Sequence, residues 1–139
     1  MGESGVKEAW LKRPELKTFL DTILKEFAPV SVILYGSTSV GGEGAWSDID
    51  ILVISEKFSG MKPHEKIGAL LEFKAGRVEA LGYTPEEFLS MVKKMNPLAL
   101  DAAVRGLPLY GEGFFNKARE LVKQLKIEKR GKMWIKKEQ

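Results

Sequence analysis

The chain has 139 residues, of which 44% are hydrophobic, and its formal net charge is +3. This length supports one domain with a hydrophobic core and is too short for two. The chain has no cysteine and one histidine, His64, which excludes disulfides, thiolate metal sites and a histidine zinc cluster, so any bound metal ion must have oxygen ligands. No apolar run approaches the roughly 20 residues that span a bilayer, and the first residues lack a signal-peptide core, so we expect a soluble, cytoplasmic protein with no membrane partner.

The positive charge is concentrated near the C-terminus. Residues 117–139 hold nine Lys or Arg and three Glu, a net charge of +6, whereas residues 1–116 have a net charge of −3. We therefore divide the chain into a domain over residues 1–126 and a basic tail over residues 127–139. A basic tail can attract nucleic acid or an acidic partner, although charge runs are most often solvated faces. Trp134 in this tail could stack on RNA or pack back on the domain.

The domain is predicted to begin with a helix and continue with strands. Apolar residues recur at intervals of three and four over residues 14–28, which predicts an amphipathic helix. The β-branched and aromatic run 30–35 predicts a buried strand. The segment 37–46 carries three glycines and is predicted to be a loop, and residues 48–54 form a second apolar run that predicts the next strand.

The rest of the domain alternates between helix and strand signals. Residues 62–75 predict a connecting helix and residues 77–81 a third strand, so that the first three predicted strands lie within residues 30–81. Helices are predicted within residues 85–126, at the starts Thr84-Pro85-Glu86-Glu87 and Asn96-Pro97 and over residues 114–125, with a brief edge strand over residues 107–110. Residues 132–137 predict either a short strand or a disordered end.

Two carboxylates occupy the second predicted strand, in a run that is otherwise apolar. Side chains alternate faces along a strand, so Asp48 and Asp50 project together while Ile49, Ile51 and Val53 face the core. Because two like charges side by side repel, this arrangement favours a bound cation. Carboxylate oxygens suit Mg2+, which binds through one or two carboxylates, waters and substrate phosphates.

A Gly-Ser pair ends the first predicted strand. Gly36 allows a sharp turn and close approach to a ligand, and Ser37 offers a backbone N–H and a hydroxyl to an anion. The pair precedes Asp48 by ten intervening residues. A loop of that length allows Ser37 and the two carboxylates to bracket one triphosphate.

Glu79 lies in the middle of the third predicted strand, where a charged side chain is unusual and suggests a specific role. If this strand pairs beside the strand of Asp48 and Asp50, three carboxylates converge, which is the arrangement used in two-metal nucleotidyl transfer. The alternative is an edge-strand residue that faces water or pairs with Arg77 or Lys74.

The segment Leu34-Tyr35-Gly36-Ser37, followed after ten residues by Asp48-Ile49-Asp50-Ile51-Leu52-Val53, resembles the signature of the DNA polymerase beta-like nucleotidyltransferase superfamily. The small size is similar to that of its minimal members. The resemblance implies the fold class α/β (α+β), with a short mixed β-sheet flanked by helices in the polymerase beta-like nucleotidyltransferase fold and with the catalytic strands within residues 30–81. It implies metal ligands and catalytic residues Asp48, Asp50 and Glu79 and nucleotide-binding residues Gly36, Ser37 and Ser47. It also implies Mg2+ or Mn2+ as cofactor and ATP or another nucleoside triphosphate as substrate.

Two functions are compatible with these residues. In the first, the protein is an Mg2+-dependent enzyme that moves a nucleoside monophosphate, AMP from ATP, to a hydroxyl of a protein or small molecule. The resemblance to small members then suggests a helical HEPN-type partner protein and a role as antitoxin. In the second, a weak or inactive nucleotidyltransferase fold docks on a protein or RNA. The segment after Ser37 lacks arginine, so Lys or Arg from elsewhere would have to neutralise the phosphates.

Overall fold

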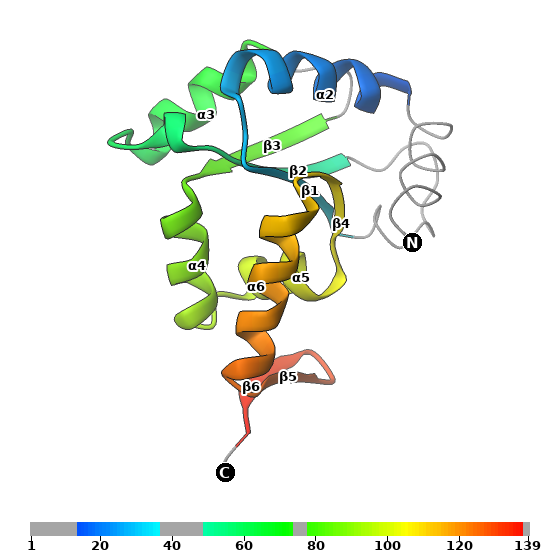
Figure 1. Ribbon diagram of the computed structural model, residues 1–139, viewed down its shortest axis with the longest axis vertical. Coiled ribbons are helices and arrows are strands. Elements are labelled where there is room, and N and C mark those ends of the chain that lie inside the picture. The colour runs from blue at the N-terminus through cyan, green and yellow to red at the C-terminus, as the bar shows by residue number, and fades with distance from the viewer. Residues whose placement is uncertain (1–13, 37–48, 74–77, 138–139) are drawn as a thin grey trace.

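The computed structural model describes residues 14–36, 49–73 and 78–137, and Figure 1 labels their helices and strands. The described helices are α2 (Pro14–Phe27), the short 3-10 helix η2 (Glu56–Phe58), α3 (Pro63–Leu71), α4 (Pro85–Lys93), α5 (Pro97–Arg105) and α6 (Glu112–Gln124). The described strands are β1 (Ser31–Tyr35), β2 (Ile49–Ile54), β3 (Val78–Tyr83), β4 (Leu107–Tyr110), β5 (Ile127–Arg130) and β6 (Met133–Lys136).

A four-stranded mixed sheet forms the centre of the fold, with the strand order β3-β2-β1-β4. β1 is antiparallel to both β2 and β4, and β2 is parallel to β3. A parallel pair requires a crossover, which η2 and α3 supply between β2 and β3. This confirms the predicted fold class, and β4 lies at the edge of the sheet as predicted.

Helices cover both faces of the sheet, α2 and α3 on one face and α4, α5 and α6 on the other (Figure 1). Ile49, Ile51 and Val53 pack against the helices of the first face, as the alternation in the sequence predicts. Leu52 and Ile54 pack on the opposite face. The sheet is therefore buried on both sides, which explains the nearly continuous apolar sequence of β2.

The helices on the second face begin at side-chain caps. The Thr84 hydroxyl accepts a hydrogen bond from Glu87 N at 3.0 Å, and the Glu87 carboxylate accepts one from Thr84 N at 2.8 Å, which completes the predicted capping box of α4. Asn96 caps α5 through its side-chain oxygen, with Leu98 N at 2.9 Å. Pro85 and Pro97 occupy first turns of these helices, where no amide hydrogen is needed.

Some boundaries differ from the prediction by a few residues. The helix predicted over residues 14–28 ends at Phe27, because Ala28 has left-handed backbone geometry with φ 41. The helix predicted over residues 62–75 spans Pro63–Leu71. β3 continues to Tyr83, two residues further than predicted, because it stays paired with β2 along its whole length.

The segment predicted as a basic tail contains a β-hairpin. β5 and β6 pair antiparallel, and Ile127 is only 6% exposed, packed with α6. Trp134 packs against the same cluster, and the Lys129 ammonium lies 5.3 Å from its ring centroid and 3.3 Å from the Asp101 carboxylate on α5. Two roles were considered for Trp134, stacking on RNA and packing on the domain. The structure shows that it packs on the domain.

No helix in the described part of the chain combines the length and apolar character needed to cross a membrane.

An almost buried lysine connects α3 to the beginning of α4. The Lys66 side chain is 7% exposed, and its ammonium donates a 2.6 Å hydrogen bond to the Glu87 carboxylate, whose side chain is 43% exposed. The same ammonium lies 5.5 Å from the centroid of the Tyr83 ring. Burial raises the pKa of the Glu87 carboxyl, but the hydrogen bonds from Lys66 and Thr84 outweigh it, so the pKa is lowered overall.

Glu87→Gln is expected to lower the free energy of unfolding by about 2 kcal/mol at neutral pH, because a neutral amide interacts more weakly than a carboxylate with the buried Lys66 ammonium. Since the folded-state pKa of Glu87 is depressed, its stabilising effect is present above the unfolded-state pKa and is lost as the pH falls through the folded-state pKa. Urea unfolding from about pH 7 to about pH 3 should therefore show the difference from the wild type shrinking. Glu86→Gln, on the same helical turn but exposed, is the control; an equal loss in both variants would contradict the role of the pair.

Candidate active site

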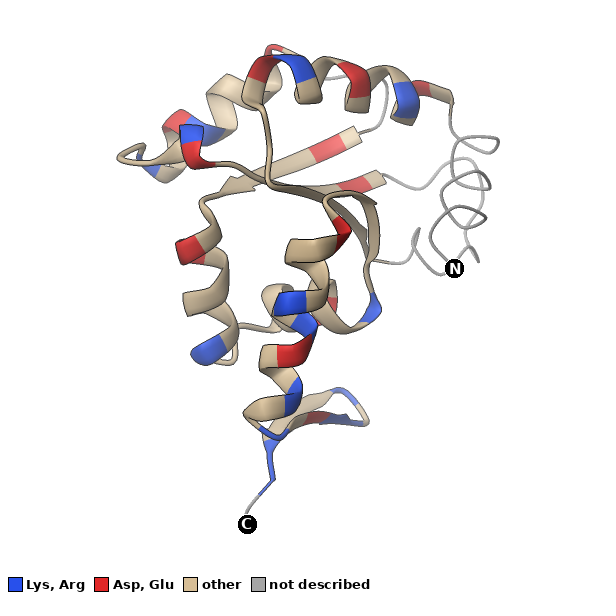
Figure 2. Cartoon of the chain, viewed as in Figure 1, with Lys and Arg blue, Asp and Glu red and all other residues tan. Residues whose placement is uncertain are grey.

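Tyr35, Asp50 and Glu79 form a row across three neighbouring strands. Asp50 is paired with Tyr35 of β1 on one side and with Glu79 of β3 on the other. Paired residues of neighbouring strands project to the same face of the sheet and lie about 5 Å apart at their Cα atoms. The predicted convergence of Asp50 and Glu79 therefore holds. In Figure 2, red bands that mark acidic positions lie on the neighbouring strands β2 and β3, near the same end of the sheet.

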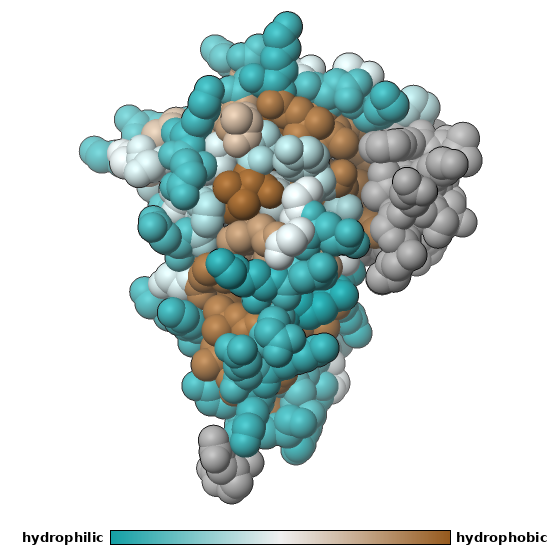
Figure 3. Space-filling model, in the orientation of Figure 1, coloured by the Kyte–Doolittle hydropathy of each residue, from teal (hydrophilic) through white to brown (hydrophobic). Residues whose placement is uncertain are grey.

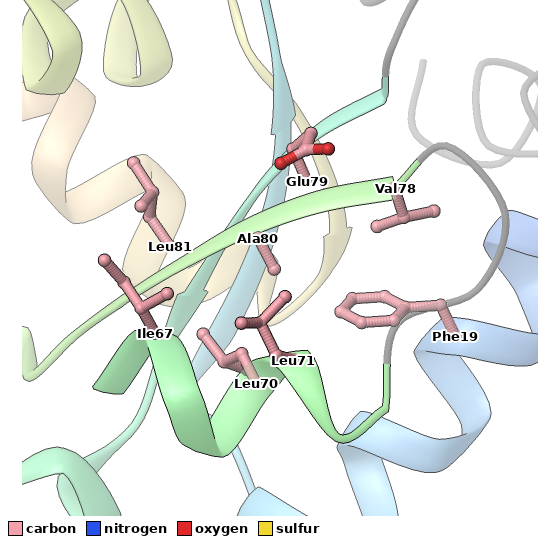
Figure 4. Close-up of a pocket in the computed structure, with 8 residues that line it drawn as sticks. All are labelled: Phe19, Ile67, Leu70, Leu71, Val78, Glu79, Ala80 and Leu81. Atoms are coloured by element: carbon pink, nitrogen blue, oxygen red, sulfur yellow. The ribbon is translucent and has the colours of Figure 1, made fainter. Parts of the chain in front are cut away.

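Because side chains alternate faces along a strand, the two carboxylates lie on the face opposite the core cluster under α2 and α3. On β3, Val78 and Ala80 pack with the cluster under α2 and α3. Figure 4 shows that Glu79 extends from the other side of the strand. Glu79 is exposed and Asp50 is half-buried, so both can reach a ligand from solvent. Glu79 is thus neither a core residue nor one on the face that carries α3.

Gly36 brings the backbone against one of these carboxylates. It follows β1 directly and has left-handed geometry with φ +81. A Cβ atom at this position would lie 2.9 Å from the Asp50 Oδ2 atom, closer than real Cβ atoms approach an oxygen. Both conditions favour glycine, which agrees with the predicted sharp turn at Gly36, while the predicted close approach to a ligand stays a prediction.

Tyr35 is the member of the row to which the sequence assigned no role. Burial, then the charge of Asp50 and then Tyr83, raises the pKa of its phenol to about 12. The hydroxyl therefore keeps its proton at neutral pH and remains a hydrogen-bond donor beside the carboxylates. Its position immediately before the glycine, at the end of a strand, is the signal in the sequence that could have identified it.

Three of the predicted site residues lie outside the described residues. These are Ser37, Ser47 and Asp48. Within the described ranges, no group of three or more His, Cys, Asp or Glu side chains is placed to hold a metal ion. His64 is exposed at the beginning of α3, away from the row. The site that can be described is therefore the pair Asp50 and Glu79, with Tyr35 and Gly36 beside it.

Comparison with known proteins decides the family. The model of a family described as "Nucleotidyltransferase domain" matches residues 15–132, most of the chain and all of the row. The chain belongs to the nucleotidyltransferase domain family. The protein is thus an enzyme, a nucleotidyltransferase, which is the class that its sequence motif indicates.

A solved structure shares the fold of this nucleotidyltransferase. It is the crystal structure, at 1.40 Å resolution, of a candidate nucleotidyltransferase from Sulfolobus solfataricus, with a TM-score of 0.50 and 22% sequence identity. The similarity covers 63% of this chain and 79% of the other. A search of curated proteins gave no match.

The described carboxylates suit the divalent metal ion that nucleotidyltransferases generally use with a nucleoside triphosphate. Asp50 and Glu79 offer hard oxygen ligands on one face of the sheet, and two adjacent carboxylates repel each other unless a cation lies near both. The Gly36 backbone, next to Asp50 Oδ2, leaves no side chain between the turn and the carboxylates. The donor set therefore fits a metal ion such as Mg2+ that also binds substrate phosphates.

A pocket of about 180 Å3 lies beside this nucleotidyltransferase's edge strand β3 (Figure 4). It is lined by the apolar residues Phe19, Ile67, Leu70, Leu71, Val78, Ala80 and Leu81, and by Glu79. An apolar wall cannot solvate a triphosphate, so the phosphates do not bind in this pocket. Ile67 and Leu71 are 44% and 58% exposed, which leaves an apolar surface next to the candidate carboxylate Glu79.

Proposed function

We propose that this enzyme transfers a nucleoside monophosphate, AMP from ATP, to a hydroxyl group of a protein or small-molecule acceptor in an Mg2+- or Mn2+-dependent reaction. The observation that carries the proposal is the pairing of Asp50 with Glu79 next to the close turn at Gly36. In the reaction, the acceptor oxygen bonds to the α-phosphorus, the bond from that phosphorus to the β-phosphate oxygen breaks, and pyrophosphate leaves. The acceptor hydroxyl gives up its proton as the new bond forms.

The residues of the row have distinct roles in this proposal. Asp50 and Glu79, together with Asp48 outside the described residues, would hold the metal ion. When bound, the ion lowers the pKa of the acceptor hydroxyl and neutralises charge on the phosphates. Gly36 lets the triphosphate approach the backbone, and Ser37 and Ser47 would contact it. The Tyr35 hydroxyl, which stays protonated, can donate a hydrogen bond to a carboxylate or to a phosphate oxygen.

Arg105 is placed to supply the positive charge that the segment after Ser37 lacks. It ends α5, and β4 begins two residues later at Leu107, which pairs with Leu34. This register puts Arg105 at the same end of the sheet as Gly36. A guanidinium binds phosphate oxygens with two parallel hydrogen bonds, so Arg105 is our candidate for binding the triphosphate from that side.

A protein acceptor, such as a helical HEPN-type partner in an antitoxin role, is supported by the apolar surface beside Glu79. Ile67 and Leu71 on α3 flank the pocket and are largely exposed. Apolar side chains of a partner could pack there and place a hydroxyl near the carboxylates. A small-molecule acceptor would make less use of this surface.

Nucleotide binding is the first test. The unfolding temperature of the full chain should rise with one or more nucleoside triphosphates in the presence of Mg2+ or Mn2+, and ATP should give the largest rise. A ligand at a hundredfold excess over its dissociation constant adds about 2.7 kcal/mol to the free energy of unfolding. The rise should be absent without the metal ion and in Asp50→Asn/Glu79→Gln. Equal unfolding temperatures under all these conditions would contradict the proposal.

A further inference from the structure

Positive charge gathers at the end of the molecule farthest from the sheet, where α6 ends and the β5–β6 hairpin begins (Figure 2). Residues 121–137 hold seven Lys or Arg and one Glu. We call this region the basic end, and it comprises the last turn of α6 and the hairpin. Its exposed lysines are Lys123, Lys126, Lys132, Lys136 and Lys137.

Some of the cations near the basic end are used within the fold. Arg119 donates hydrogen bonds to the backbone oxygens of Ala103 and Val104, and Lys129 pairs with Asp101. Arg130 and Lys137 share the Glu128 carboxylate. Within the described ranges, by contrast, Lys123, Lys126, Lys132 and Lys136 form no ion pair. The positive charge of the basic end therefore exceeds what the fold itself uses.

Three of these lysines surround one hollow. It is lined by Lys123, Lys126, Ile127 and Lys137 and has a volume of about 460 Å3. The backbone fixes their proximity: Lys126 N donates to Lys123 O at 3.0 Å, and Lys137 N donates to Lys126 O at 2.7 Å. The end of α6 and the last strand of the hairpin are thus joined at Lys126.

The backbone of Lys126 has a conformation that residues other than glycine rarely adopt. Its φ of 59 is in the left-handed region, immediately after the C-cap residue Leu125 of α6, where glycine is the usual residue. A non-glycine residue there costs stability. A lysine in the last helical turn complements the helix dipole, which accounts for Lys123 but not for Lys126 or Lys137, both beyond the helix. Replacing Lys126 by glycine therefore removes its charge without straining the backbone.

The chemistry of the basic end favours a polyanion over a protein or a membrane. Protein interfaces are depleted in lysine and rich in aromatic residues, and membrane-binding surfaces need an apolar side. Among the described residues of the basic end, Met133 is the one large apolar side chain that is exposed. The face over α6 and the hairpin in Figure 3 is largely hydrophilic.

We propose that the basic end binds nucleic acid through its phosphate backbone, with Lys123, Lys126 and Lys137 contacting a phosphate in the hollow between them. Spaced lysines without aromatic stacking residues bind backbone charge with little preference for sequence. The inference is independent of nucleotidyl transfer, because binding through these lysines needs neither the triphosphate nor the metal ion.

The test measures the affinity of the full chain for a fluorescent oligouridylate by anisotropy at several salt concentrations, without nucleotide or metal ion. The triple variant Lys123→Gln/Lys126→Gly/Lys137→Gln should bind about tenfold more weakly or worse. The slope of the logarithm of affinity against the logarithm of salt concentration should fall by about 0.7, the contribution of the one phosphate that these lysines contact.

A single substitution separates binding from folding. Lys126→Gly removes the charge but relieves the left-handed backbone, so this variant should unfold at the same or a higher temperature while binding more weakly. The matched control, Lys25→Gln/Lys93→Gln/Lys94→Gln, removes three exposed lysines elsewhere and should bind like the wild type. Equal affinity and salt slope in the triple variant and the wild type would overturn the proposal. Competition by polyglutamate as strong as that by unlabelled RNA would overturn nucleic acid as the ligand.

Discussion

Asp50→Asn is expected to reduce nucleotidyl transfer by about a thousandfold or more, the loss of about 4 kcal/mol of transition-state stabilisation. Asp50 is the central member of the row, between Tyr35 and Glu79. Tyr35 has no carboxylate, and the proposal already uses the Glu79 carboxylate as a ligand, so neither neighbour can replace the Asp50 carboxylate. Asparagine keeps the shape of the side chain but is a much poorer metal ligand. Release of pyrophosphate, measured with ATP and either Mg2+ or Mn2+, reports the effect.

The fold should survive the same substitution. Asn removes one of two adjacent negative charges, so the metal-free variant should unfold at a temperature close to that of the wild type. Asp21→Asn is the matched control, because Asp21 is exposed on α2 and forms a surface pair with Lys17 at 3.6 Å. It should leave transfer within about twofold. A catalytic loss that occurs equally in both variants, or with unfolding of Asp50→Asn, would contradict the assignment.

Gly111→Ala should destabilise the protein by about 3 kcal/mol or more. Gly111 precedes α6 and has φ +73, and a Cβ atom there would lie 1.9 Å from the Val30 backbone oxygen. That oxygen cannot yield easily, because Val30 N is hydrogen-bonded to Ile54 O at 2.7 Å and Ser31 Oγ donates to Tyr110 O at 3.0 Å. The added methyl group would have to push β1 away from the start of α6.

Two other glycines separate the causes of this loss. Gly60 has φ +79 with open space around it, so Gly60→Ala should cost only the backbone penalty, about 1 kcal/mol. Gly113 lies within α6 with nothing in reach, so Gly113→Ala should stabilise by about 0.5 to 1 kcal/mol. Urea unfolding of the three variants gives the comparison. A Gly111→Ala variant no less stable than Gly60→Ala would refute the predicted clash.

The sequence predicts the order of the elements well where local chemistry decides it. Pro29 and Gly36 bracket β1, and the caps at Thr84 and Asn96 begin α4 and α5 where predicted. The adjacency of Asp50 and Glu79 was conditional on pairing of their strands, which no local signal fixes. The structure supplies it through the parallel register of β2 and β3.

Other features depend on contacts between distant residues and were not predicted. β5 is a short, charged segment with no strand signal, and it forms because Ile127 and Trp134 pack on α6. Lys66 would be expected on the polar side of an amphipathic helix, yet it is buried by its pairing with Glu87, 21 residues away. Tyr35 gains its place in the row only when β2 pairs with β1.

The topology places the candidate carboxylates on strands, apart from the connections that join those strands to the rest of the fold. β1 ends at the site, and β2, β3 and β4 all begin at that same end of the sheet, since β1 is antiparallel to both neighbours. The connections entering there can change in length or composition while the strands hold the carboxylates in register. A fold of this kind is well suited to functional divergence. Proteins with this fold can acquire new acceptors when the connections between strands change, while the chemistry at the strands remains the same.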